Sequence, residues 1–305
     1  MATLKELSRR PERLSAGHRM CPGCGAPILV RMALRCTEDH LVVGCATGCL
    51  EVSTSIFPQT AWRCSFIHNA FENSAATISG VEAAYRALSK KGKVKKPFKF
   101  LAFGGDGGTY DIGLQSLSGM LERGHNMVYI CYDNEAYMNT GIQRSSSTPL
   151  GAATTTTPAG KVEQGKKQFP KDLTGIVVAH RIPYVAQASI SNWRDLSNKI
   201  EKAFAVDGPA FINALAPCPR GWRFPASDTV EIAKLAVDTC FWPLYEVEDG
   251  QWKVNYKPRQ KKALEEWIKV QGRFRHLTRP ANRGILEQAQ AEVDRRWEEL
   301  LAKAS

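Results

Sequence analysis

Residues 103–113, FGGDGGTYDIG, place four glycines around one aspartate, Asp106, directly after the apolar run FKFLAF (98–103). Glycine lets a ligand approach the backbone closely, and a strand, a glycine-rich turn and a helix together form a common phosphate site. A carboxylate beside a phosphate would be repelled unless a divalent cation lay between them. Mg²⁺ binds one or two carboxylates together with phosphate oxygens. We therefore expect Asp106 to bind Mg²⁺ on a phosphorylated ligand.

A second metal ligand is expected where the next apolar run, MVYICY (127–132), continues into DNEAYMNTGIQ (133–143). The gap between Asp106 and Asn134 is long enough for one helix and one strand to return beside the first strand. The plainer interpretation is a tight surface turn at GGDGG and a helix cap at DNE. The position of both motifs at successive strand ends favours a shared cation.

The elements that must position these residues alternate between apolar strand-like runs and helix-like segments. This alternation predicts an α/β fold, with a parallel sheet covered by helices on both faces and ligands beyond the carboxyl ends of the strands. We expect a ligand-binding domain over residues 1–225 and a C-terminal extension over residues 226–305, with a hairpin at 241–258 and a charged terminal helix at 282–304. The expected strands are 41–45, 98–103, 127–132, 184–189 and 209–216, and the expected helices are 73–91, 111–124, 172–181 and 192–205.

The composition of the 305 residues is that of an ordinary globular protein, with 43% hydrophobic residues. No apolar stretch reaches the length of a membrane span, and MATLKELSRRPERL lacks the apolar centre of a signal peptide, so we expect a cytoplasmic protein. The net charge of +11 is spread along the chain, with clusters at 90–99 and 257–262 that contain no interleaved stacking aromatics. This pattern argues against nucleic-acid binding and for a solvated face or an acidic protein partner.

The nine cysteines indicate thiol or metal chemistry, because the chain shows no secretion signal. CPGC (21–24) is a two-ligand metal motif that, taken alone, fits half of a zinc site or a redox dithiol. However, no second CxxC occurs, and CPGC precedes the first strand instead of following it. A [4Fe–4S] cluster needs four thiolates that can be distant in sequence. Spacing leaves the other ligands open among Cys36, Cys45, Cys49, Cys64, Cys131, Cys218 and Cys240.

Five segments, in this order, resemble the β subunit of pyruvate:ferredoxin oxidoreductase, of the 2-oxoacid:ferredoxin oxidoreductase family. The resemblance covers about residues 15–225 and implies a thiamine diphosphate-binding fold. The spacing from GDG to an asparagine is shared by thiamine diphosphate enzymes, whereas NEAYMNTG is specific to this family and its close relatives. The segments are CPGCG (21–25), CATGC (45–49), GGDGGTYDIG (104–113), YDNEAYMNTGIQRSSSTP (132–149) and APCPRGW (216–222).

The resemblance assigns expected roles to individual residues. Its Mg²⁺ ligands are Asp106, Asn134 and the backbone carbonyl of Ala136, and its diphosphate contacts are Gly48, Gly105, Gly107 and Thr140. Asn139 is expected to face the reacting carbon, where an amide can hydrogen-bond a developing alkoxide. Without that role Asn139 is a turn residue in NTG.

The resemblance also selects the ligands of a [4Fe–4S] cluster, which are Cys21, Cys24, Cys49 and Cys218. Cys45 is a rival because it shares the segment CATGC with Cys49. We interpret Cys45 as the buried end of a strand.

The function implied by the resemblance is oxidative decarboxylation of pyruvate to acetyl-CoA and CO₂, with electrons passed to ferredoxin. The glutamate that activates the cofactor comes from a partner α chain in the resembled enzymes. We therefore expect half an active site that assembles with α, γ and ferredoxin-like δ chains or with fused equivalents. The same architecture serves other 2-oxoacids and oxalate, the last without coenzyme A. Two further alternatives are a non-catalytic zinc-binding subunit and a nicotinamide dehydrogenase, the latter disfavoured because no GxGxxG follows a strand.

Overall fold

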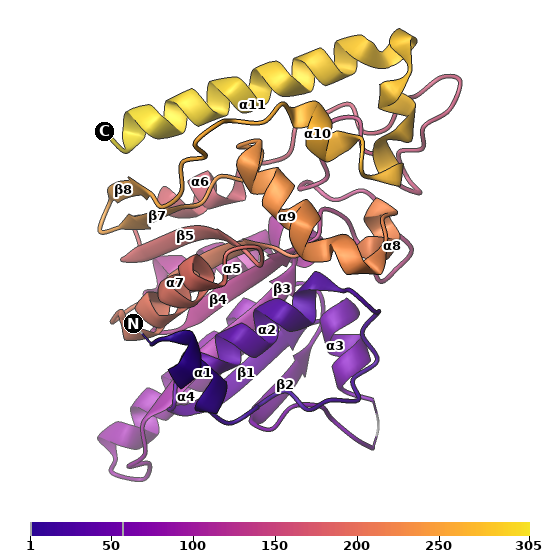
Figure 1. Ribbon diagram of the computed structural model, residues 1–305. Helices are drawn as coiled ribbons and strands as arrows, with labels where there is room; N and C mark the ends of the chain where they lie inside the picture. The colour runs from indigo at the N-terminus through magenta and orange to yellow at the C-terminus, as the bar shows by residue number, and fades with distance from the viewer. Residues whose placement is uncertain (1, 57) are drawn as a thin grey trace.

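The computed structural model describes residues 2–56 and 58–305, which build one sheet in the strand order β2-β1-β3-β4-β6-β5-β7-β8 (Figure 1). The strands from β2 to β5 in this order run parallel, and the hairpin β7–β8 adds antiparallel strands at one edge. This confirms the expected α/β fold. The strands are β1 (His40–Ala46), β2 (Ser65–Asn69), β3 (Phe98–Gly105), β4 (Val128–Asp133), β5 (Tyr184–Ser189), β6 (Ala210–Leu215), β7 (Tyr245–Glu248) and β8 (Gln251–Val254).

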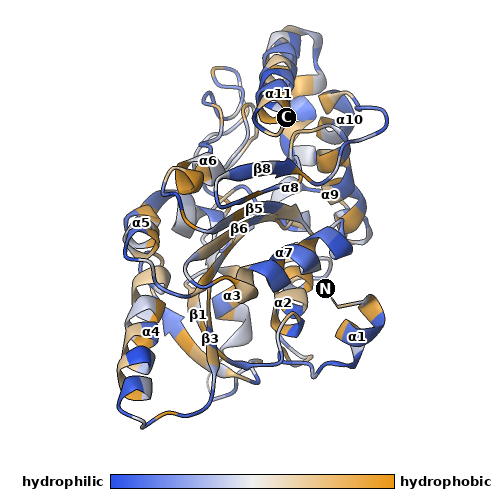
Figure 2. Cartoon of the chain, turned by 90° about the vertical axis from the view of Figure 1, so that its left-hand side faces the viewer, coloured by the Kyte–Doolittle hydropathy of each residue, from blue (hydrophilic) through white to orange (hydrophobic). Residues whose placement is uncertain are grey.

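Helices cover both faces of the sheet, with α4, α5 and α6 on one face and α2 and α7 on the other (Figure 2). The central strands are therefore apolar on both sides, as buried parallel strands are. In β4, for example, Ile130 packs in the core under α2 and α7, and Cys131 packs in the core under α4 and α5. These helices are α2 (Gly25–Arg35), α4 (Ser74–Lys90), α5 (Leu114–Glu122), α6 (Leu173–Val178) and α7 (Trp193–Ala205).

The expected strands and helices occur in the structure, but one expected helix is divided, and several observed elements were not predicted, among them β2 and α2. The short edge strand β2 was not predicted, because SFIHN is half-exposed and contains no apolar run. The helix expected at 111–124 is divided into a π-helical turn, η1 (Gly107–Ile112), and α5. Single π-helical turns often occur at functional sites, and this one follows Asp106 directly.

The C-terminal residues form the expected hairpin, whose turn lies at Asp249–Gly250, and the expected terminal helix α11, drawn in yellow in Figure 1. A third apolar core joins this region to the sheet, since Trp222 and Trp267 pack in the same cluster as Leu215 of β6. The domain boundary at residue 225 stays a prediction. The remaining elements are α1 (Leu4–Arg9), α3 (Cys49–Thr54), α8 (Pro219–Trp222), η2 (Ala226–Asp228), α9 (Thr229–Asp238), α10 (Leu264–Ile268), η3 (Gly272–Thr278), η4 (Pro280–Asn282) and α11 (Arg283–Lys303).

Candidate cofactor and cluster site

Four neighbouring parallel strands end in the segments that are expected to carry the site. β1 continues into Thr47–Cys49, β3 into Asp106, β4 into Asn134 and β6 into residues 216–218. Because β1, β3, β4 and β6 are adjacent and parallel, their carboxyl ends lie along one edge of the sheet. The fold therefore brings together motifs that are far apart in the sequence.

Asp106 is buried, with 1% of its surface exposed. Its Oδ1 accepts a hydrogen bond from the Asn134 backbone N–H at 3.3 Å, and its Oδ2 accepts one from the Ser145 hydroxyl at 2.5 Å. Burial, reinforced by the charge of Asp133, raises the pKa of Asp106 well above its ordinary value, although both hydrogen bonds oppose this. A divalent cation at the carboxylate would favour its ionised form.

The Asn134 side chain points its oxygen at two other oxygens, Asp106 Oδ1 and the Ala136 carbonyl, each 2.9 Å away. Without a cation the reversed amide is favoured, because its nitrogen then donates to both oxygens. Neighbouring ligand oxygens around octahedral Mg²⁺, with bonds of about 2.1 Å, lie about 3 Å apart. The separations from Asn134 to the other two expected ligands therefore fit one Mg²⁺ ion.

The turn that carries these ligands is fixed by hydrogen bonds from several other segments of the chain. Trp222 Nε1 donates to the Asn134 carbonyl at 2.7 Å, and Thr148 Oγ1 donates to the Glu135 carbonyl at 2.7 Å. Glu135 has a φ of 65°, a left-handed conformation that is uncommon for residues other than glycine. Arg273 Nη2 donates to Glu135 Oε2 at 2.5 Å. Burial raises the pKa of Glu135 to about 7, while the Arg273 charge lowers it.

One pocket of about 310 Å³ is lined by every residue expected to contact the cofactor or its metal. A Cβ atom at Gly107 would lie 2.4 Å from the Tyr137 ring, so this position excludes any side chain unless Tyr137 moves. Gly107 is therefore packed closely against Tyr137, and both residues belong to the wall of the pocket. The expected residues in the lining are Gly48, Gly105, Asp106, Gly107, Asn134, Ala136, Asn139 and Thr140.

The four cysteines expected to bind a cluster lie within electrostatic reach of one another. Burial, followed by the nearby thiols of Cys218, Cys49 and Cys21, raises the pKa of Cys24 to about 12. Burial and the thiols of Cys218 and Cys21, with the carboxyl of Asp106, raise the pKa of Cys49 to about 12. Thiolates at these positions need a compensating positive charge, which bound iron would supply.

Three of these cysteines lie at helix N-termini. Cys24 is the N-cap of α2, Cys218 is the N-cap of α8, and Cys49 is the first residue of α3. The Gly221 N–H donates to Cys218 Sγ at 3.3 Å. Backbone N–H groups and helix N-termini stabilise anionic sulfur, so the donor set fits an anionic cluster.

The remaining five cysteines are not part of this group. Cys45 is fully buried, and its thiol donates to the Ala46 carbonyl at 3.5 Å. Burial raises the pKa of Cys45 well above its ordinary value, with the Glu51 charge as the second cause and no contribution from the four grouped thiols. Burial also raises the pKa of Cys36, Cys64, Cys131 and Cys240, and none of the four grouped thiols is among the causes.

Across residues 2–56 and 58–305, no three cysteine, histidine or acidic side chains are arranged as ligands of a single metal ion. A structural zinc ion would draw its four ligands to about 2.3 Å from one point. A [4Fe–4S] cluster instead distributes four thiolates over separate iron atoms. The choice between a cluster and zinc at the four grouped cysteines therefore stays a prediction from the sequence.

Several residues of this site were not foreseen from the sequence. Ser145 bonds Asp106, and Ser147 donates to both carboxylate oxygens of Asp133, at 2.8 and 2.7 Å. Asp133 is itself buried, which raises its pKa to about 6. The only signal for these contacts was the hydroxyl-rich run SSST that follows NTGIQR. Nothing in the sequence indicated that Arg273 contributes to this site, because it lies outside every motif.

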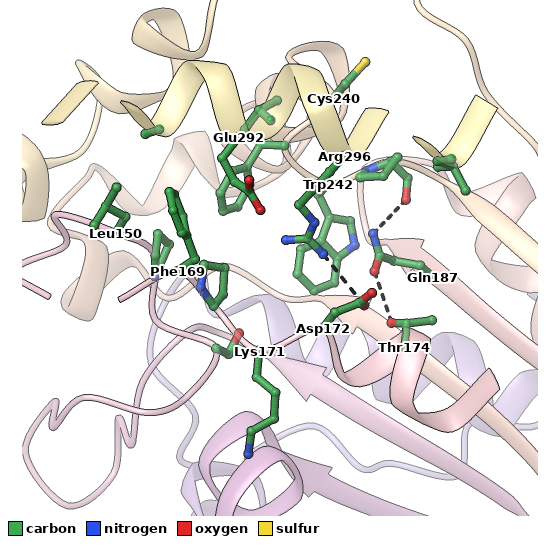
Figure 3. Close-up of a pocket in the computed structure, with 18 of the residues that line it drawn as sticks. Leu150, Phe169, Lys171, Asp172, Thr174, Gln187, Cys240, Trp242, Glu292 and Arg296 are labelled. Atoms are coloured by element: carbon green, nitrogen blue, oxygen red, sulfur yellow. Dashed lines mark hydrogen bonds and ion pairs between the residues drawn. The ribbon is translucent and has the colours of Figure 1, made fainter. Parts of the chain in front are cut away.

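A second, larger hollow of about 1140 Å³, partly open to solvent, lies under α11 (Figure 3). One of its lining residues is Glu135, which belongs to the turn that carries the expected Mg²⁺ ligands. Its polar groups bond to one another, since Gln187 accepts from Thr174 at 3.1 Å and Arg296 lies 3.7 Å from Asp172. We therefore place the chemistry in the smaller pocket, which contains the expected ligands.

The fold and the pocket define a thiamine pyrophosphate-binding domain. Residues 43–214 match the family described as "Thiamine pyrophosphate enzyme, C-terminal TPP binding domain". The match extends from β1 to β6 and includes the eight residues expected to contact thiamine diphosphate or its Mg²⁺, whereas Cys21, Cys24 and Cys218 lie outside it.

The relatives of the chain identify the particular family. It is 57% identical to the pyruvate synthase subunit PorB of Thermotoga maritima, over 97% of this chain and 94% of that protein. It is 46% identical to the ketoisovalerate oxidoreductase subunit VorB of Pyrococcus abyssi, over 95% and 92%. The chain belongs to the pyruvate synthase subunit PorB family of 2-oxoacid:ferredoxin oxidoreductases, and it is one subunit of a hetero-oligomeric enzyme. The expected family is thereby confirmed.

A solved structure shares the fold. The 2-oxoglutarate:ferredoxin oxidoreductase of Magnetococcus marinus, with 2-oxoglutarate, coenzyme A and succinyl-CoA bound, is 19% identical, with a TM-score of 0.58 over 73% of this chain and 79% of that chain. In the part of the chain that the structure describes, no helix has the length and apolarity of a membrane span.

Proposed function

We propose that this subunit binds thiamine diphosphate through Mg²⁺, carries a [4Fe–4S] cluster, and serves in the oxidation of pyruvate to acetyl-CoA and CO₂. The proposed Mg²⁺ ligands are Asp106, Asn134 and the Ala136 carbonyl. The proposed cluster ligands are Cys21, Cys24, Cys49 and Cys218. Electrons leave for ferredoxin through the cluster.

One observation carries the proposal. One terminal atom of the Asn134 side-chain amide lies 2.9 Å from both Asp106 Oδ1 and the Ala136 carbonyl oxygen, which is the spacing of neighbouring ligand oxygens around one Mg²⁺ ion. The same three residues line the glycine-walled pocket at the carboxyl ends of the strands. Together they support a Mg²⁺-bridged diphosphate.

When bound, thiamine diphosphate supplies the carbanion chemistry by which a 2-oxoacid loses CO₂. The residues of this chain hold and surround it. Gly105 and Gly107 leave room for the diphosphate, and Asn139, an exposed member of the pocket wall, presents an amide toward the reacting end. Cys49 lines the same pocket, so a cluster held by Cys49 would lie near the cofactor and would accept its electrons over a short distance.

The family supports a proposal for the substrate and for the partners. Pyruvate is the proposed substrate because a relative named pyruvate synthase subunit is 57% identical over 97% of this chain. A branched 2-oxoacid is the second candidate, since VorB is also a full-length relative. Oxalate, without coenzyme A, is a third alternative that rests on the sequence resemblance alone. The proposed partners are an α chain that supplies the activating glutamate, a γ chain and a ferredoxin-like δ chain.

The test is metal and cofactor analysis of the anaerobically purified complex, followed by dye reduction. We expect iron, sulfide, Mg²⁺ and thiamine in the protein, whereas zinc without iron would exclude the proposal. Dye reduction is then compared with pyruvate, 2-oxoisovalerate, 2-oxoglutarate and oxalate, each with and without coenzyme A. We expect the fastest coenzyme A-dependent reduction with pyruvate, and a faster rate with another acid would reassign the substrate.

A further inference from the structure

Tyr132 has a buried hydroxyl group that nothing in the described chain satisfies. The residue lies near the end of β4 and is 1% exposed, with its ring in the apolar core under α2 and α7. Among the described residues its hydroxyl has no hydrogen-bond partner. The Leu50 backbone N–H faces the phenol oxygen and lowers its pKa slightly, but without the geometry of a hydrogen bond. Buried polar groups in folded proteins are rarely left in this state.

The hydroxyl lies between the two glycine segments of the cofactor pocket. A Cβ atom at Gly48 would lie 2.7 Å from the phenol oxygen, and one at Gly105 would lie 3.3 Å from it. Both glycines and Tyr132 line the pocket that contains Asp106. The unpartnered oxygen is thus directed at the place where the diphosphate is expected.

Other buried tyrosines of the chain are partnered. The Tyr184 hydroxyl donates to Glu246 Oε2 at 2.8 Å, the Tyr110 hydroxyl accepts from Asn213 at 2.7 Å, and the Tyr129 hydroxyl lies 3.1 Å from Thr109 Oγ1. Tyr132 differs from these three in that its hydroxyl has no such partner and the residue lines the pocket. A missing partner that is a ligand accounts for this difference.

We propose that Tyr132 is a diphosphate-binding residue, whose hydroxyl donates a hydrogen bond to an anionic oxygen of thiamine diphosphate. This inference rests on the proposed function and adds a contact that neither glycine motif contains. The phenol suits the role, because a tyrosine hydroxyl is an uncharged hydrogen-bond donor. A neutral donor stabilises the anion without adding a charge beside Asp106.

The alternative is that Tyr132 serves only as a packing residue whose ring fills the space next to Gly48 and Gly105. In that case the hydroxyl contributes nothing to ligand binding. The two interpretations predict different results for Tyr132→Phe, which removes the oxygen and keeps the ring.

The experiment uses the full-length chain in its complex, purified anaerobically and stripped of thiamine diphosphate. The dissociation constants of thiamine diphosphate with Mg²⁺, and of inorganic pyrophosphate with Mg²⁺, are measured by calorimetry for wild type and Tyr132→Phe. We expect both constants to rise by about tenfold or more, because hydrogen bonds to charged groups contribute that much. We expect the melting temperature of the stripped complex to stay level or rise, because an unsatisfied buried group is removed.

Tyr184→Phe is the matched control, because Tyr184 is equally buried on the same face of the sheet but is already partnered by Glu246. We expect it to lower the melting temperature and leave both dissociation constants unchanged. Unchanged dissociation constants in Tyr132→Phe would overturn the inference. A fall in the melting temperature of the stripped complex as large as that of the Tyr184→Phe control would overturn it as well. Failure of the wild-type complex to bind thiamine diphosphate would instead overturn the proposed function.

Discussion

The guanidinium of Arg273 lies against the carboxylate of Glu135, with 2.5 Å between Nη2 and Oε2, although 138 residues separate the two in the chain. Both side chains are buried. The guanidinium also lies 3.9 Å from the centre of the Trp222 ring, whose Nε1 donates to the Asn134 carbonyl. The C-terminal region therefore supports the turn that carries the proposed metal ligands.

This buried pair predicts strong energetic coupling. Arg273→Met leaves Glu135 buried without its cation, and we expect it to cost about 3–5 kcal/mol of unfolding free energy. Glu135→Gln together with Arg273→Met removes both charges, so we expect the double variant to regain much of that loss. Chemical denaturation of the wild type, both single variants and the double variant completes the cycle. Additive losses would show that the pair is not coupled.

Asp106→Asn separates metal binding from folding. Burial raises the pKa of Asp106, so its ionised form is costly in the empty pocket. We expect the variant to match or exceed the wild type in stability without cofactor, and to lose at least about a hundredfold in Mg²⁺-dependent cofactor affinity. Asp111→Asn is the control, because Asp111 lies in the adjacent turn, where it accepts from the Ser146 N–H and interacts with Lys171 and Tyr137, and it is not an expected metal ligand. Equal affinity losses in both variants would contradict the metal assignment.

We expect opposite results when each of the two cysteines of CATGC (45–49) is replaced by serine. Cys49 is electrostatically coupled to Cys21 and Cys218, whereas Cys45 is fully buried and bonded to the Ala46 carbonyl. We expect Cys49→Ser to lose the iron, the sulfide and the reduced-cluster EPR signal. Cys45→Ser should retain all three. Loss of the signal only in Cys45→Ser would reverse the assignment.

Asn139 is expected to act on the reaction and not on cofactor affinity. Its amide lines the pocket at an exposed position, whereas the proposed metal ligands are buried. We expect Asn139→Ala to lower kcat by about 10²–10³, the loss typical of a removed oxyanion donor, with unchanged thiamine diphosphate affinity. Steady-state dye reduction and calorimetry measure the two quantities. A weakened affinity with normal kcat would make Asn139 a binding residue instead.

We expect the buried Lys166 side chain to make the free energy of unfolding depend on pH. It is 2% exposed and donates to the carbonyls of Thr148 and Ser146, at 2.5 and 3.1 Å. Burial, and next the Arg144 charge, lowers the pKa of Lys166 from 10.5 to about 8. The folded state therefore releases this proton at lower pH than the unfolded state does. The free-energy cost of burying the charged Lys166 amine is fully present below about pH 8 and disappears as the pH rises toward 10.5.

We expect the stability of the wild type to rise relative to Lys166→Met between pH 8 and 10. Denaturation midpoints of both proteins across this range provide the measurement. Lys167→Met is the control, since it removes the neighbouring lysine, whose side chain is 66% exposed instead of buried. A difference between wild type and Lys166→Met that does not change with pH would show that Lys166 has an ordinary pKa.

Much of the central fold was predictable from periodicity, because buried parallel strands are short continuous apolar runs between amphipathic helices. Five strands and the hairpin were foreseen in this way. β2 was not, because an edge strand buries too little surface to need an apolar run. The division of the helix after Asp106 was also missed, since a π-helical turn has no pattern of its own.

The sequence by itself determined the local chemistry: a glycine turn around Asp106, an asparagine after the next strand, and cysteines in short motifs. Only the tertiary structure decided which of these groups meet, because contact depends on strand order and not on separation along the chain. The adjacency of β1, β3, β4 and β6 groups Cys49 with Cys218 and leaves Cys45 in the core. The same packing brings Arg273 to Glu135 from a region with no motif, and such a contact follows from the shape of the whole core.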